Sequence, residues 1–195
     1  VELPLQRGRI IPLETSDSSL LYDIVSIDQV KDKYFIRSRN KILTFDTEGN
    51  YLYNISGIGQ GNKEYVNLSS FFIKNEELCI YDFNQGRVLV FAPSGRYLRT
   101  EKAVKNSDVE CVPQLIRPYG KNKYIAKNSF NGTPGYVTPA LSLLDEKYTI
   151  TRTLEGHSLN TGFLLFDFMN CDDNGGFITY WEALSDTIYT VVNDS

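Results

Sequence analysis

Short runs of hydrophobic residues alternate with polar turns along most of the chain. From Tyr22 onward, apolar runs such as Tyr34-Phe35-Ile36 are separated by groups of Gly, Asn, Asp, Ser and Lys. Strands that recur at intervals of about 8–12 residues, with turn residues between them, are typical of a sandwich, a barrel or a propeller. No segment keeps a helical period with a suitable cap. The pattern therefore predicts an all-β fold.

Hydrophobic residues and glycines recur in this pattern at a fixed interval. The first two copies lie 46 positions apart, through Phe45 and Phe91, Gly49 and Gly95, and Leu52 and Leu98. Alignment of the third strands adds Leu144 and Val191 to Phe45 and Phe91. Repeats of roughly 45–50 residues with four strands each are typical of propeller blades, whereas a sandwich needs no equal repeats. We therefore predict a β-propeller of four-stranded blades with about four repeats, at residues 22–56, 68–104, 114–154 and 163–192.

The two ends of the chain depart from this pattern. Residues 1–21 form an N-terminal segment in which Arg9 to Leu13 is predicted as an edge strand, because proline within a strand is tolerated mainly at sheet edges. The fourth repeat, whose first strand is predicted at 163–168, lacks an outer strand. Either the N-terminal strand completes that blade and closes a four-bladed ring, or residues 1–195 are a partial propeller within a larger one.

Composition narrows the class of protein. The chain is 42% hydrophobic with 13 Tyr and 11 Phe, which is enough for a core and favours strands. Its net charge of −4 and pI of about 5.1 give no support for nucleic-acid binding, which normally shows a basic patch and a high pI. No apolar run is long enough to predict a transmembrane segment.

The residues that most often bind metals or carry catalysis are few and scattered. Three cysteines without a C-x-x-C spacing argue against a disulfide framework or a zinc site, and Cys79 reads as a buried hydrophobic residue. His157 is the only histidine and follows Gly156 in a polar loop. The acidic run 172–176 lacks the spacing of a calcium loop and predicts a hairpin turn. We expect no cofactor or metal and assign no catalytic residue.

The glycine-rich run 57–61 has the spacing G-x-G-x-G, which also occurs in phosphate-binding loops. Such a loop needs a helix directly after it, whereas residues 62–65 lead toward another strand. We expect the glycines to supply positive φ angles and to let the connection between two blades pass close to its neighbour. Glu64 is expected to bind backbone amides of the loop.

Two places are candidates for ligand binding. Arg37 and Arg39 belong to the basic turn 37–41, which reads either as an anion-binding rim on a propeller face or as a solvated turn. Trp181 and Glu182 follow the apolar run at 177–180. There the indole either stacks on a sugar or peptide or packs between blades.

The stretch from Phe45 to Leu98 resembles the NHL type of propeller repeat. The residues that carry this resemblance are Phe45, Asp46, Gly49, Gly57, Gly59, Gly61, Glu64, Tyr65, Asp82, Arg87 to Phe91 and Gly95. The whole chain is similar to the six-bladed propeller lipoproteins of Bacteroides and its relatives, through the runs 11–15, 57–65 and 185–189. The resemblance implies a secreted, periplasmic or lipid-anchored protein, with the anchor upstream of residue 1. Since this chain has roughly four repeats and the similar proteins have six blades, the resemblance favours the partial propeller.

Three functional hypotheses remain. The first is a non-catalytic extracytoplasmic module that presents loops on a propeller face to a carbohydrate, peptide or protein. The alternative is a propeller enzyme, such as a metal-dependent hydrolase or lyase, with its site at the central channel. The third is self-association, because open blades expose unpaired strand edges.

Overall fold

The computed structural model describes residues 8–103, 112–129, 139–154, 168–171, 177–181 and 188–192. Within these ranges the regular elements are β-strands in four antiparallel sheets, three of four strands and one of three. The all-β prediction is confirmed for the described residues.

Each sheet is formed by strands that follow one another in the chain. Sheet 1 contains β1 (Ser26–Val30), β2 (Lys33–Ser38), β3 (Lys41–Asp46) and β4 (Tyr51–Ile55). Sheet 2 contains β5 (Ser70–Lys74), β6 (Glu77–Asp82), β7 (Arg87–Phe91) and β8 (Tyr97–Lys102). Sheet 3 contains β9 (Val112–Pro118), β10 (Tyr124–Ser129), β11 (Leu141–Leu144) and β12 (Ile150–Leu154). Sheet 4 contains β13 (Phe168–Cys171), β14 (Phe177–Trp181) and β15 (Ile188–Val192).

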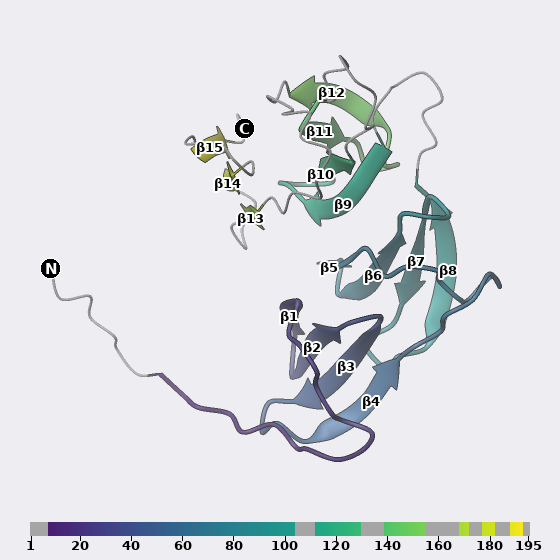
Figure 1. Ribbon diagram of the computed structural model, residues 1–195, viewed down its shortest axis with the longest axis vertical. Helices are drawn as coiled ribbons and strands as arrows, with labels where there is room; N and C mark the ends of the chain where they lie inside the picture. Colours follow the sequence, from purple (N-terminus) through teal and green to yellow (C-terminus); the bar gives the residue numbers. More distant parts are fainter. Residues whose placement is uncertain are drawn as a thin grey trace, which may run out of the picture.

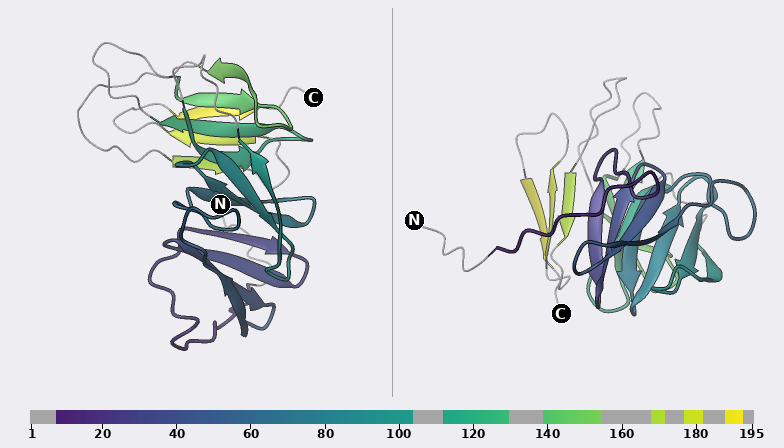
Figure 2. Two further views of the ribbon diagram at one scale, coloured as in Figure 1. Left: turned by 90° about the vertical axis from the view of Figure 1, so that its right-hand side faces the viewer. Right: turned by 90° about the horizontal axis from the view of Figure 1, so that it is seen from below.

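The first three sheets follow one another along an arc (Figure 1). Their first strands β1, β5 and β9 lie on the inner side of the arc and their last strands on the outer side. Strand β5 contacts both β9 and β1, so the inner strands hold neighbouring sheets together. The two further views in Figure 2 show the same succession of separate sheets. This arrangement is propeller-like.

The interval of 46 residues corresponds to a turn that recurs in successive sheets. Gly49 and Gly95 follow the third strands of sheets 1 and 2 and have φ angles of 90° and 81°. The Gly49 amide donates to Asp46 O at 3.1 Å, and the Gly95 amide donates to Ala92 O at 2.9 Å. In sheet 3 the same bond joins Tyr148 and Asp145 at 3.0 Å, and Tyr148 has a φ of 61°. A left-handed residue therefore closes this turn each time.

The recurring aromatic residues pack beside this turn. The third strands of sheets 1 to 3 each have an irregularity in their pairing with the fourth strand at the aligned position, at Phe45, Phe91 and Leu144. In the first two sheets the aromatic ring makes an edge contact with a tyrosine at the start of the fourth strand, with ring centroids 5.9 Å and 5.8 Å apart. The spacing of aromatic residues in the sequence therefore reflects one local packing unit.

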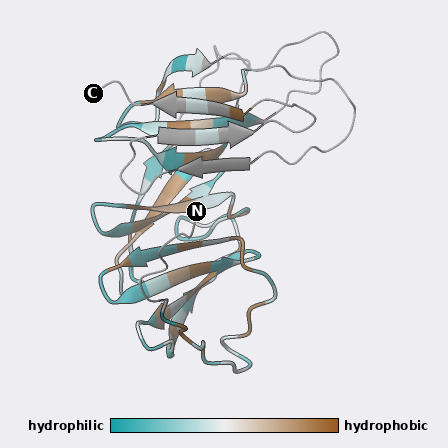
Figure 3. Ribbon diagram, turned by 90° about the vertical axis from the view of Figure 1, so that its left-hand side faces the viewer, coloured by the Kyte–Doolittle hydropathy of each residue, from teal (hydrophilic) through white to brown (hydrophobic). Residues whose placement is uncertain are grey.

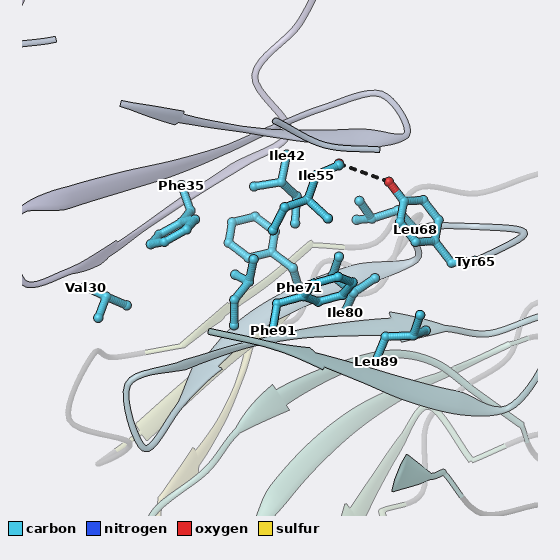
Figure 4. Packing of buried hydrophobic residues seen from close by; sticks show 11 residues of the cluster. Val30, Phe35, Ile42, Ile55, Tyr65, Leu68, Phe71, Ile80, Leu89 and Phe91 are labelled. Atoms are coloured by element: carbon cyan, nitrogen blue, oxygen red, sulfur yellow. Dashed lines mark hydrogen bonds between the residues drawn. The ribbon is translucent and has the colours of Figure 1, made fainter. Parts of the chain in front are cut away.

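The cores lie between sheets rather than within one sheet. Phe35 and Ile42 of sheet 1 pack with Phe71, Ile80 and Leu89 of sheet 2 (Figure 4). A second cluster joins the opposite face of sheet 2 to sheet 3. Figure 3 shows that the hydrophobic stretches lie mainly within the strands. Full burial of one such side chain contributes about 1.5–3 kcal/mol, so contacts between sheets are the main source of stability.

The N-terminal segment differs from its prediction. Arg9 to Leu13, predicted as an edge strand, forms no strand, and this segment instead packs against sheet 1 beside Gly49. The amide of Glu14 donates to Gly49 O at 2.8 Å, and the Tyr51 amide donates to the Glu14 carboxylate at 2.9 Å. Pro12 has no N–H to give to a ladder, and these few bonds hold the segment without one.

The first strand of the fourth repeat was predicted at 163–168, and most of this range lies outside the described residues. Strand β13 begins at Phe168, where the predicted strand ends, and residues 163–167 lie outside the described ranges. Pairing with β14 aligns Phe168 with Trp181 and Cys171 with Ile178.

Candidate functional site

The basic turn between β2 and β3 is held by an aspartate. Asp23 Oδ1 accepts hydrogen bonds from Ser38 Oγ and from the Arg39 amide, both at 3.0 Å. Arg39 has a positive φ of 52°. Because the carboxylate fixes this strained turn, the side chains of the turn project from a rigid base.

Two cations of this turn gather around one exposed tyrosine. The Arg39 guanidinium lies 4.2 Å from the centre of the Tyr22 ring, and Lys41 Nζ lies 5.9 Å from it. These are distances at which a cation is attracted to an aromatic face. Tyr22 remains 60% exposed. The turn therefore displays an aromatic ring together with positive charge.

Arg37 faces the next sheet instead of solvent. Its Nη1 donates to Ser69 O at 2.7 Å and its Nε donates to Arg39 O at 3.3 Å. Burial lowers the pKa of Arg37 below its usual range, and the nearby charge of Arg117 lowers it further. Arg37 thus links sheet 1 to the start of sheet 2 while it carries a partly buried charge.

Arg117 of β9 was not among the predicted site residues. Its Nη1 donates to Phe71 O on β5 and lies 3.8 Å from Asp28 Oδ2 on β1. Side chains of sheets 1 and 3 therefore meet beside the backbone of β5, which lies between them. The only signal in the sequence is a charged residue within the apolar run 115–119.

We call the group Tyr22, Arg37, Arg39, Lys41 and Arg117 the arginine surface. Contacts link the residues of the basic turn, and the charge of Arg117 is close enough to Arg37 to lower the pKa of Arg37. Two carboxylates are bound within this group of four cations: Asp28 forms an ion pair with Arg117, and Asp23 accepts a hydrogen bond from the Arg39 amide. The surface is therefore basic, although the chain carries a net charge of −4. It includes both arginines predicted as ligand-binding candidates.

The glycine-rich connection joins sheet 1 to sheet 2. Glu64 Oε2 accepts a hydrogen bond from the Gly61 amide at 2.9 Å, and a side chain on Gly59 would place its Cβ 2.0 Å from that carboxylate. Gly57, Gly59 and Gly61 do not adopt the positive φ angles that were predicted for them. Close approach of the Glu64 carboxylate, rather than a left-handed backbone, therefore favours glycine at position 59. The loop leads to β5, so it lacks the helix that a phosphate-binding loop needs.

Tyr65 at the end of this connection is buried and binds back to sheet 1. Its hydroxyl donates toward Asn40 O at 2.6 Å and Ile55 O at 3.2 Å, and the second bond is drawn in Figure 4. Burial raises the pKa of Tyr65 to about 12. The residue therefore fixes the connection in place and is not a candidate proton donor at neutral pH.

The second pair of candidates is only partly within the described residues. Trp181 is the last residue of β14 and its backbone pairs with Ile188. Glu182, His157 and the run 172–176 lie outside the described residues. Cys79 is buried as expected, and burial raises the pKa of its thiol to about 12.

No group of three or more His, Cys, Asp or Glu side chains within the described ranges is placed to hold a metal ion. The same part of the chain contains no helix that is long and apolar enough to span a membrane.

The antiparallel sheets, arranged along an arc with their first strands inside, define a propeller-like all-β protein. The model of the family described as a domain of unknown function, DUF4934, matches residues 6–195. The chain therefore belongs to the DUF4934 family. A comparison with curated proteins finds no match.

Solved structures with a similar fold come from bacteria and fungi. A Bacteroides fragilis protein described as exported has a TM-score of 0.74 and 18% identity, over 95% of this chain and 52% of that one. A member of the DUF4221 family from Bacteroides vulgatus has a TM-score of 0.63 and 9% identity, over 93% and 57%. The WD40 domain of Neurospora crassa Pan2 has a TM-score of 0.50 and 12% identity, over 87% and 46%. The chain spans about half the length of the structures it resembles.

Proposed function

We propose that this protein is a non-catalytic, extracytoplasmic binding module that engages a carbohydrate, peptide or protein through the arginine surface. The observation that carries this proposal is the exposed Tyr22 ring with Arg39 and Lys41 around it, on a turn fixed by Asp23. Binding residues are commonly placed on loops that a rigid scaffold positions. An aromatic ring supplies contact area, and guanidinium groups supply directed hydrogen bonds.

The location outside the cytoplasm is part of the proposal. It is supported by the similarity in fold to a Bacteroides fragilis protein described as exported. The lipid anchor upstream of residue 1 rests on the resemblance to propeller lipoproteins. Fractionation of the producing cells, with metabolic labelling by a fatty acid, tests both parts. A protein found in the cytoplasm would overturn the localisation, and an unlabelled protein outside it would overturn only the anchor.

The full architecture is likewise proposed. We propose a six-bladed ring of NHL-like blades, to which residues 1–195 contribute one domain or partial propeller. The length comparison supports this, because the chain covers 52% and 57% of two similar structures. A partial ring exposes unpaired strand edges and would associate with itself. Light scattering of the 195-residue chain tests this last point, and a stable monomer would contradict it.

The binding proposal is tested with glycan and peptide arrays. The intact chain is compared with Arg39→Ala, and Lys102→Ala on the outer strand β8 serves as the control that removes a distant charge. We expect binding to be lost in R39A and kept in K102A. Absence of binding together with turnover of a substrate would overturn the proposal and favour the alternative, a propeller enzyme. Trp181 and Glu182 remain proposed contacts, and Trp181→Ala in the same array tests the first of them.

A further inference from the structure

One face of sheet 1 packs on sheet 2, and its other face lies at the end of the arc (Figure 1). We call this second face the open face, and its apolar residues are Ile27, Ile36, Leu43 and Phe45. Ile27 pairs with Ile36, which pairs with Leu43, and the last three of the four residues form one buried cluster. The open face therefore carries an apolar row across the first three strands.

The open face matches, residue by residue, the face of sheet 2 that packs on sheet 1. The Val25 amide donates to Arg37 O and the Ser69 amide donates to Tyr81 O, both at 3.0 Å, so the two inner strands begin in the same way. From there the strands of both sheets pair in the same register. The four residues of the open face thus correspond to Phe71, Ile80, Leu89 and Phe91, which all belong to the core between sheets 1 and 2.

The two faces differ in how far they are covered. Phe71 is 0% exposed, and so is Leu68, which precedes it. The corresponding residues of sheet 1, Ile27 and Ile24, are 54% and 57% exposed. The N-terminal segment packs against the cluster that contains Ile36 and leaves these two residues accessible. Apolar residues that repeat a core pattern and yet stay exposed mark an interaction surface.

The N-terminal segment lies against sheet 1 as the outer strand of sheet 1 lies against sheet 2. At the turn of sheet 2, a Cβ on Gly95 would meet the ring of Tyr53, which belongs to the outer strand β4. At the matching turn of sheet 1, a Cβ on Gly49 would meet Pro12 O of the N-terminal segment. This segment therefore occupies the place that the outer strand of a preceding blade would have.

Sheet 1 itself shows which kind of partner fits such a face. It packs on Phe71 with Val30, Phe35 and Ile42, which come from its first three strands (Figure 4). Its fourth strand adds Tyr53 to the same core. On the open face the N-terminal segment takes the place of that fourth strand. The matching partner is therefore a three-stranded antiparallel sheet with an apolar face.

We propose that the open face is the closing interface of the ring, where Ile24 and Ile27 pack on the first three strands of the last blade. Residues 9–14 are the outer strand of that blade, and the same polypeptide supplies its other three strands after residue 195. This inference rests on the proposed partial propeller. Two structures of similar fold support the source, because this chain covers only 52% and 57% of their lengths. A closed ring also protects strand edges that are open in a partial one.

Alkylation of Ile27→Cys tests the proposal. Its reaction with iodoacetamide, followed by mass spectrometry of peptides, is compared between the 195-residue chain and the full-length product of the gene. We expect the thiol to react about tenfold or more slowly in the full-length product, because a buried side chain reacts only when the interface opens. Leu52→Cys, at a position 41% exposed on the outer strand β4, is the control and should react equally in both.

Circular dichroism shows whether each variant is folded, and Ile24→Cys carries the test if I27C is not. Equal rates at the tested position in both proteins would overturn the proposal. A full-length product that ends at residue 195 would overturn it as well. Protection within the 195-residue chain that grows with protein concentration would also overturn it and assign the open face to a second copy.

Hydrogen exchange tests the role of residues 9–14 separately. In the 195-residue chain, Arg9 to Leu13 form no strand. Paired as an outer strand, some of these amides should exchange about tenfold or more slowly in the full-length product. The amide of Glu14, which already donates to Gly49 O, is the internal control and should change little. Equal exchange in both proteins, with position 27 protected, would overturn the assignment of the outer strand.

The outcomes separate this inference from the binding function. If position 27 is protected and no array ligand binds, the closing interface stands and the binding module is wrong. If an array ligand binds in an Arg39-dependent manner and position 27 reacts equally in both proteins, the binding module stands and the closing interface is wrong.

Discussion

Sheets 1 and 2 are built to the same plan but differ in what covers them. Both have four antiparallel strands in chain order and the same turn after the third strand. Sheet 2 lies between two sheets, and its inner strand buries Phe71 and Phe72 on opposite faces, at 0% and 1% exposure. The inner strand of sheet 1 leaves Ile27 54% exposed. The inner strand of this repeat is therefore buried on both faces in sheet 2, whereas in sheet 1 one of its faces stays partly exposed.

The difference shows that a repeat of this kind depends on its neighbours for its core. One face of sheet 1 packs on sheet 2, and Leu13 and Leu21 of the N-terminal segment pack against part of the other. In repeat proteins, stability is approximately the sum of each unit and its contacts with adjacent units. Equivalent substitutions in the two sheets should therefore have unequal effects, and five experiments examine the contacts on which this difference depends.

The largest effect is expected for Phe71→Ala. This side chain fills the interface between sheets 1 and 2, so its removal leaves a cavity and should cost about 3–5 kcal/mol. Urea titration of the folded chain measures the change. Phe72→Ala, at the interface with sheet 3, should cost a similar amount because sheet 2 is covered on both faces. A small effect of either variant would show that one of these interfaces contributes little.

The turn glycines should respond unequally. Alanine is strained at the φ angles of Gly49 and Gly95, which costs roughly 1–3 kcal/mol. A Cβ at Gly49 would also lie 2.1 Å from Pro12 O, whereas at Gly95 it would meet the Tyr53 ring at 2.7 Å. A ring can move more readily than backbone, so we expect G49A to lower the urea midpoint more than G95A. The reverse order would mean that the N-terminal segment does not hold its position against sheet 1.

Tyr65→Phe should cost about 1–2 kcal/mol, because the connection loses its hydroxyl bonds to sheet 1. The matched control is Tyr51→Phe, which loses only an exposed bond to Asn54.

The same tyrosine predicts a loss of stability at high pH. Burial raises the pKa of Tyr65 from 10.0 to about 12 and that of Cys79 from 9.0 to about 12. The folded state therefore holds these protons more tightly, and stability is complete below about pH 9 and falls as the pH rises toward 12. Urea midpoints between pH 8 and pH 11 should fall less steeply for Tyr65→Phe. Equal slopes would count against burial of the hydroxyl.

The smallest effect is expected for Ile27→Ala. Its side chain is half exposed on the uncovered face of β1, so the change should stay within about 0.5 kcal/mol in the same urea titration. A cost close to that of Phe71→Ala would show that this face is covered in solution and would remove the difference between the two sheets.

The sequence predicted the strands well where one physical rule dominated. The spacing of Phe45 and Phe91, with Gly49 and Gly95, reports a packed turn that must recur if the sheets are alike. Interfaces buried on both faces also leave continuous apolar runs, such as that of β6, which are easily read.

The remaining differences between the predictions from the sequence and the structure arise from contacts between distant segments. Arg9 to Leu13 has an apolar pattern, but the hydrogen bonds that hold this segment are made by the next residue, Glu14, to a turn far along the chain, and local propensity does not report them. Arg37 was predicted from its basic turn, whereas its partner Arg117 comes from another sheet. The two arginines come close because β5 contacts both β1 and β9, and no short motif encodes those contacts.

The connection between the first two sheets has a consequence for proteolysis. Gly61, which precedes Lys63, has its carbonyl bound to Arg87 of sheet 2 at 2.9 Å. Tyr65, which follows Lys63, is bound to Asn40 and Ile55 of sheet 1. After trypsin cleavage at Lys63, these hydrogen bonds would therefore still join the two fragments across the cut. A nicked chain should run as one particle on a sizing column and separate into two pieces only in denaturant.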